Sequence, residues 1–168
     1  MLKKYSLSTK ANGMNSTDNK TTEKTAETMA EKENQLVSEF SQLASWEERY
    51  QLLIEKGRQM PSWPENEKKE DLKVKGCQSQ VWLKAEMKEG RIVFSADSDA
   101  LISKGLISIL IEVYSQSTPE EILNYRPEFI KKIGLDSSLS PSRANGLYSM
   151  MKQMQFYALA FQLKSAPK

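Results

Sequence analysis

Histidine is absent from this chain of 168 residues, and Cys77 is its only cysteine. Without histidine, neither a Cys–His pair nor a Ser–His–Asp triad can form. One cysteine cannot make an internal disulfide, close a structural zinc site or ligate an iron–sulfur cluster within a single chain. These absences leave carboxylate chemistry, lysine chemistry, phosphate handling and the lone thiol.

Several other sequence signals are missing. The 24 Lys and Arg residues nearly balance the 22 Asp and Glu residues, for a net charge of +2, and no basic block predicts nucleic-acid binding. The longest apolar run, residues 105–114, is short and contains Glu112, which argues against a membrane span. No Walker A loop, dinucleotide-binding glycine motif or EF-hand spacing is present. The single cysteine and the lack of a secretory leader favour a reducing, cytoplasmic location.

The composition of the chain changes near residue 35. Residues 1–34 are rich in Lys, Thr, Ser, Asn and Glu, so we expect a disordered tail, followed by one domain over residues 35–164. The tail begins with lysines and no acidic residue, which gives it a faint similarity to an organelle transit peptide. It lacks arginine, however, and a solvated tail is the favoured interpretation.

The spacing of apolar residues predicts an α+β fold. Residues 81–87 and 91–97 alternate in polarity around a turn at Lys88–Glu89–Gly90, which predicts a hairpin. Helical spacing predicts helices from about Gln35, over 46–58, over 99–115, after Thr118 and from Pro141. In the first strand, the apolar Val81, Leu83, Ala85 and Met87 alternate with Gln80, Trp82, Lys84 and Glu86, and we interpret Trp82 as a core residue without a direct function. We therefore expect a small antiparallel sheet packed with helices.

Cys77 is the first candidate for chemistry. Its thiolate would be the nucleophile, although a thiol with an ordinary pKa of about 8.5 is little ionised at neutral pH. Gly76 can adopt a turn conformation forbidden to other residues, and the polar Gln78 follows, so Cys77 can project from a loop before the strand. The alternative is a structural role, because free cysteines are often buried in cores.

Two further segments carry candidate charges. We expect Asp97 to cap the helix that follows it, which leaves Asp99 partly redundant as a cap and free to meet an outside cation. Arg143 lies in the first turn of a predicted helix, where a cation opposes the helix dipole. This predicts a nearby carboxylate or an anionic partner, and the alternative is an ordinary surface arginine.

The motifs WEERYQLLIEKG, VKGCQSQVWL, ADSDALISKGL and LSPSRANGL, in this order, resemble the SufE family over residues 36–162. The resemblance implies an α+β fold shared with IscU-type scaffolds. It also implies that the protein accepts persulfide sulfur onto Cys77 from a SufS-type cysteine desulfurase. The protein would stimulate that enzyme and pass the sulfur to an iron–sulfur scaffold complex. Asp99 and Arg143 match family positions associated with docking or with the environment of the cysteine loop, whereas Ser103 departs from a branched apolar residue common there.

The resemblance favours a carrier and activator over an independent catalyst. Pyridoxal phosphate would belong to the partner, and we expect no cofactor or metal in this chain. Sulfane transfer needs one mobile cysteine, and a second nearby thiol could resolve the persulfide into a disulfide. We expect the Cys77 loop to shelter the thiol at rest and to swing outward on docking.

Three alternatives stay open. The first is a CsdE-like acceptor for a CsdA-type desulfurase, and the second is a one-Cys thiol redox enzyme such as a peroxide reductase. The third is a purely structural interaction module. A cluster scaffold is excluded for a monomer, because such scaffolds need several cysteines.

Overall fold

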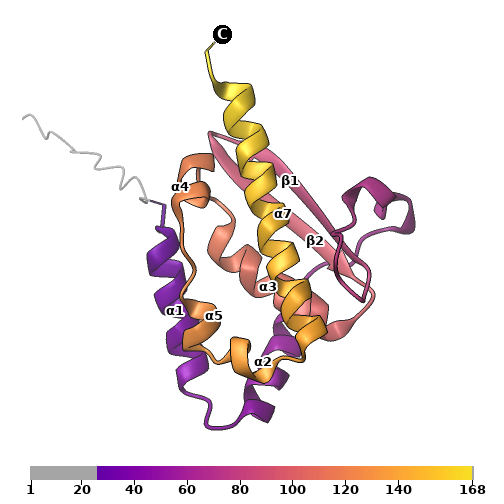
Figure 1. Ribbon diagram of the computed structural model, residues 1–168, viewed down its shortest axis with the longest axis vertical. Coiled ribbons are helices and arrows are strands. Elements are labelled where there is room, and N and C mark those ends of the chain that lie inside the picture. Colours follow the sequence, from indigo (N-terminus) through magenta and orange to yellow (C-terminus); the bar gives the residue numbers. More distant parts are fainter. Residues whose placement is uncertain (1–25, 168) are drawn as a thin grey trace, which may run out of the picture.

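The structure, a computed structural model, describes residues 26–167. A β-hairpin and several helices surround one central helix, α3 (Figure 1). The elements are α1 (Met29–Ser41), α2 (Trp46–Gln59), the 3-10 turns η1 (Glu65–Glu67) and η2 (Glu70–Leu72), β1 (Val81–Lys88), β2 (Arg91–Ser98), α3 (Leu101–Tyr114), α4 (Pro119–Asn124), α5 (Phe129–Lys132), α6 (Leu135–Ser138) and α7 (Pro141–Ser165). The predicted α+β class is confirmed.

The sheet is an antiparallel hairpin of β1 and β2, with Leu83 opposite Ala96. Its two-residue turn places Glu89 and Gly90 at positive φ, of 50° and 74°, as the twist of a tight hairpin requires. Leu83 and Phe94 of one face are buried against α3 and α7, and Ala85 and Met87 of the same face are partly buried. Alternating polarity therefore sets both the pairing and the buried face, as predicted.

Trp82 belongs to the other face of β1, and it is buried too. The side chain is only 6% exposed, because residues 61–73 fold over that face of the strand. Lys73 forms an isolated β-bridge with Trp82, and Lys68 Nζ lies 5.2 Å from the centre of the indole ring. The alternation of β1 cannot reveal that Trp82 is covered, because the covering segment has no regular hydrophobic spacing of its own.

Helix α3 is buried along almost its whole length because the hairpin, α1, α2 and α7 all pack against it. The approach of α2 is closest where Gly57 faces Gly105: a Cβ at Gly105 would lie 2.2 Å from the carbonyl oxygen of Leu53. Helix α7 runs along the other side of α3 and also contacts β1 (Figure 1). This arrangement brings the N-terminal half of α7 beside the segment that enters β1.

The first helix begins earlier than predicted. Thr28 caps α1 in a reciprocal capping box with Glu31, and Met29 is buried in the core. Glu33 is buried too, where it accepts hydrogen bonds from the Tyr125 hydroxyl and from Lys132. The predicted boundary between residues 34 and 35 therefore falls inside α1, and the predicted start of the first helix near Gln35 is corrected to Met29. Residues 1–25 of the predicted tail lie outside the described residues.

Between residues 26 and 167, no helix combines the length and the apolar character needed to cross a bilayer.

Candidate functional site

The loop of residues 75–80, here called the Cys77 loop, connects the 61–73 segment to β1. Gly76 has a φ of +93°, in the region that favours glycine, and a Cβ there would lie 2.6 Å from Ser149 Oγ. A residue with a side chain would meet both backbone strain and a collision with α7. Gly76 thus lets the backbone turn, as the sequence predicted, and in this turn Cys77 lies against α7.

The thiol of Cys77 is half-buried against α7. Its Sγ lies 3.6 Å from the carbonyl oxygen of Gly146, to which the thiol donates. A Cβ on Gly146 would lie 3.5 Å from Sγ, so glycine leaves the room that the thiol occupies. Burial raises the pKa of the Cys77 thiol, which keeps it protonated at neutral pH. The thiol is therefore sheltered in this conformation.

A cavity of about 180 Å³ opens beside the thiol. Its lining includes Cys77, Gln78, Ser79, Ile102, Ser142 and Arg143. Water occupies roughly 30 Å³ per molecule in the liquid, so the cavity can accept an added atom on the sulfur without displacing a helix. Two of the predicted site residues, Gln78 and Arg143, thus share one cavity with Cys77.

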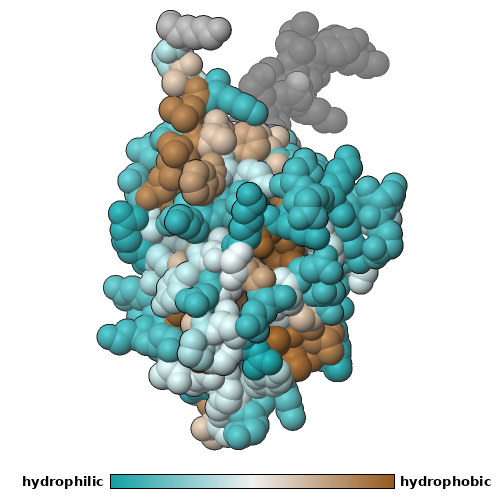
Figure 2. All heavy atoms as spheres, turned by 45° about the vertical axis from the view of Figure 1, so that its right-hand side comes forward, coloured by the Kyte–Doolittle hydropathy of each residue, from teal (hydrophilic) through white to brown (hydrophobic). Residues whose placement is uncertain are grey.

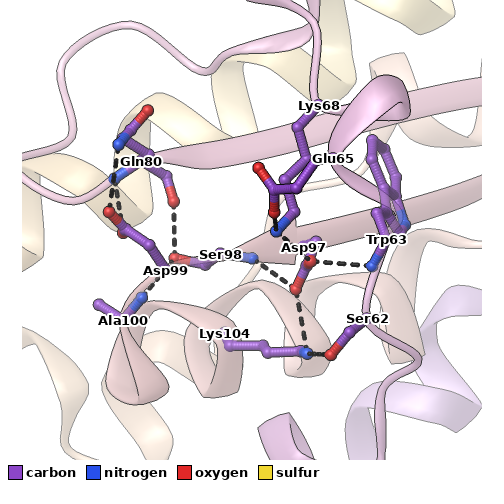
Figure 3. A network of polar contacts seen from close by, with 10 residues as sticks. All are labelled: Ser62, Trp63, Glu65, Lys68, Gln80, Asp97, Ser98, Asp99, Ala100 and Lys104. Atoms are coloured by element: carbon purple, nitrogen blue, oxygen red, sulfur yellow. Dashed lines mark hydrogen bonds and ion pairs between the residues drawn. The ribbon is translucent and has the colours of Figure 1, made fainter.

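The far end of the loop is held by polar contacts with the start of α3 (Figure 3). The backbone N–H of Gln80 donates to Asp99 Oδ1 at 2.9 Å, and its carbonyl accepts from Ser98 Oγ at 2.8 Å. Nearer the thiol, Ser79 Oγ and Ser103 Oγ lie 2.5 Å apart. Asp99 is exposed, but its carboxylate already accepts hydrogen bonds from the loop, so it is less free to bind an outside cation than predicted.

Asp97 was predicted to cap α3, and this is wrong. The helix begins after Ala100 without a side-chain cap, and Asp97 is only 2% exposed. Its carboxylate accepts the backbone N–H of Trp63 at 2.9 Å and pairs with Lys104 Nζ at 3.0 Å (Figure 3). Burial opposes ionisation, but these donors and the N–H of Ser98 outweigh it and lower the pKa of Asp97. Asp97 therefore fastens the 61–73 segment to β2 and α3.

Arg143 is exposed in the first turn of α7. Its guanidinium lies 6.0 Å from the ring centre of Tyr50, and within residues 26–167 it has no carboxylate at ion-pair distance. The predicted neighbouring carboxylate is thus not found there, and the predicted anionic partner stays a prediction. Ser140 occupies the N-cap position of α7 without a side-chain cap bond.

Sequence reasoning missed several residues of the site. Gly146 accepts the thiol's hydrogen bond, and Ser149 occupies the space that a side chain at position 76 would need. Both residues lie about 70 positions from the loop, and no local pattern connects them to it. Ser79 could have been found, since a serine at position 103, where apolar residues are common in the resembling family, invites a search for its polar partner.

Comparison with known proteins shows the family of this chain. Residues 34–158 match the model of the SufE family, described as an Fe-S metabolism associated domain. The chain belongs to the SufE family. It is 41% identical over 128 residues to an uncharacterized SufE-like protein of Synechocystis sp. strain PCC 6803, covering 76% of this chain and 80% of that protein.

The fold is also similar to a solved structure. A hypothetical protein from Thermus thermophilus, determined in solution, superposes with a TM-score of 0.64 at 25% identity and covers 77% of this chain and 94% of its own. Membership of the SufE family implies a sulfur-transfer role in iron–sulfur metabolism and a cysteine desulfurase as partner.

Proposed function

We propose that Cys77 accepts persulfide sulfur from a SufS-type cysteine desulfurase, that docking stimulates the desulfurase, and that the sulfur then passes to an iron–sulfur scaffold complex. One observation carries the proposal: the only thiol of the chain lies beside a small cavity, on a loop held by a few hydrogen bonds. A carrier needs such a thiol, because it must be reached by two partners in turn.

The transfer step is a thiol exchange. The thiolate of Cys77 attacks the outer sulfur of the desulfurase persulfide, and a new S–S bond forms on Cys77. The S–S bond of the donor breaks, and the donor cysteine leaves as a thiolate that takes up a proton. No electrons are gained or lost overall, and Cys77 becomes a persulfide. The second transfer, to the scaffold, repeats this exchange with Cys77 as the donor.

The resting geometry fits a carrier that is activated by its partner. Burial raises the pKa of Cys77, and the nearest polar contact of the thiol is a carbonyl oxygen, which does not stabilise a thiolate. When the loop leaves α7, the thiol loses this burial and enters the electrostatic environment of the partner. A one-Cys peroxide reductase would need a lowered thiol pKa in the free protein, which argues against that alternative.

The experiment is intact-mass analysis after incubation with a SufS-type desulfurase, pyridoxal phosphate and cysteine. The wild-type chain should gain the mass of one sulfur atom, and a Cys77→Ser variant should gain none. Absence of any gain on the wild type, with the desulfurase shown to be active, would refute this partner. Repeating the incubation with a CsdA-type enzyme tests the CsdE-like alternative.

A further inference from the structure

A second cavity lies farther along α7, between that helix and residues 71–75. It has a volume of about 630 Å³ and is larger than the cavity beside the thiol. We call it the lysine groove, after the residues that line it: Lys73, Lys75, Lys152, Ser149, Phe156 and Tyr157. The mechanism above makes no use of this groove.

The groove carries positive charge that is not neutralised by neighbouring side chains. Lys75 and Lys152 are both exposed, one on each wall, and neither forms an ion pair within residues 26–167. Lys73 is paired with Glu70 at 2.6 Å, and Asp71 is the only acidic residue of the lining. Two cations facing each other across a groove attract a ligand with carboxylates.

The groove continues into an apolar surface. Phe156, which lines it, is 59% exposed, and Leu163 farther along α7 is 69% exposed. Figure 2 shows an apolar patch along the C-terminal part of α7. Large exposed rings next to charged residues are typical of protein–protein contact surfaces.

The groove and the Cys77 loop share one wall. Ser149, which lines the groove, is also the residue against which Gly76 packs, one position before Cys77. A protein that reaches Cys77 with a bound persulfide must therefore cover part of the groove. The N-terminal residues 1–25 are a poor occupant, because their five lysines exceed their two acidic residues and the groove would repel them.

We propose that the lysine groove binds an acidic segment of the sulfur-donating desulfurase, with carboxylates against Lys75 and Lys152 and an apolar side chain against Phe156. This inference rests on the proposed function. Docking beside the loop would hold the donor while the thiol moves. Charge pairs at the edge of an interface act mainly on the rate of association, and salt weakens them.

The test compares Lys75→Glu/Lys152→Glu with the wild type, at increasing concentrations of a SufS-type desulfurase. Sulfur gained on Cys77 is read by intact mass. Charge reversal at two contacts should raise the half-saturating desulfurase concentration by about tenfold, with full loading at saturation and a weaker dependence on salt. Arg58→Glu/Lys131→Glu is the matched control, because it changes the net charge by the same amount at two exposed cations, on α2 and α5, that form no ion pair within the described part of the chain. Neither residue lines a cavity described here, and the control should leave the titration unchanged.

The same half-saturation and salt dependence in the double variant and the wild type would overturn the inference. An equal loss in Arg58→Glu/Lys131→Glu would also overturn it, since the effect would then follow net charge alone. Failure of the wild type to gain sulfur at any concentration is a separate result: it would refute the proposed function, and with it the basis of this inference.

Discussion

Two irregular segments precede β1, and the structure holds them in different ways. The 61–73 segment is fastened by Asp97, which is buried and pairs with the buried Lys104. The Cys77 loop is fastened by Asp99, which is exposed and, among the described residues, accepts hydrogen bonds from Gln80 alone. The two carboxylates lie two residues apart in the sequence and close together in space (Figure 3).

This difference makes the 61–73 segment a fixed platform and the Cys77 loop the part that can move. Removing one member of a buried ion pair leaves an uncompensated charge, whereas a hydrogen bond to an exposed carboxylate can be replaced by water. The 61–73 segment, which covers Trp82, should therefore stay closed under conditions in which the Cys77 loop opens. A sulfur carrier needs both, because a mobile thiol must still be presented from a fixed position.

The largest expected effect is the loss of stability in Asp97→Ala. The variant leaves Lys104 buried without its partner, and we expect a decrease of about 3–5 kcal/mol in the free energy of unfolding. Asp99→Ala should cost about 1 kcal/mol, as for an exposed hydrogen bond. Denaturant unfolding of both variants measures the comparison directly, and equal losses would refute it.

The pH dependence of stability should show part of the same effect. The folded-state pKa of Asp97 lies below its ordinary value, so its contribution is complete above the unfolded-state pKa and is lost as the pH falls through the folded-state value. Wild-type stability should therefore decrease in acid more steeply than that of Asp97→Ala. Parallel pH profiles would contradict an ionised, stabilising Asp97.

A substitution at Gly76 should affect the Cys77 loop selectively. Gly76→Ala meets strain of about 1–2 kcal/mol at positive φ and also crowds Ser149 Oγ, so the closed position of the loop against α7 is destabilised. We expect faster alkylation of Cys77 by iodoacetamide. The control is Gly90→Ala, which has a similar φ of +74° but open space for the new methyl group. An acceleration in Gly90→Ala as well would contradict a local effect.

The smallest expected effect concerns the contact between Ser79 and Ser103. Ser103→Val removes one hydrogen bond of the loop, which should raise the alkylation rate of Cys77 by about fivefold, equivalent to about 1 kcal/mol. Ser108→Ala is the control, because Ser108 donates to the carbonyl of Gly105 within α3 and does not contact the loop. The double variant Ser79→Ala/Ser103→Val should be no faster than Ser103→Val, since both changes remove the same bond.

The sequence predicted those features that follow from local periodicity. The hairpin, the long helices and the class of the fold come from alternation and helical spacing. The turn conformation of Gly76 was predicted from the residue type alone. The predictions failed where a distant segment determines the environment. Asp97 looks like a helix cap until the 61–73 segment brings the N–H of Trp63 to it, and the alternation of β1 does not show that the same segment covers Trp82.

The candidate site was predicted in part for the same reason. Cys77, Gln78 and Arg143 share one cavity, as a common site requires, and Asp99 holds the loop. Gly146 and the lysine groove depend on the packing of α7 against residues 71–77, which no short stretch of sequence encodes.

The most direct test of the comparison between the two segments is amide hydrogen exchange at two residues of the free protein. The N–H of Trp63 donates to Asp97 and the N–H of Gln80 donates to Asp99, so the two amides have the same kind of acceptor. Exchange at Gln80 should be about a hundredfold faster than at Trp63. This corresponds to a difference of about 3 kcal/mol between local opening of the Cys77 loop and the wider opening that exposes Trp63. Equal rates, or slower exchange at Gln80, would show that the Cys77 loop does not open independently of its platform.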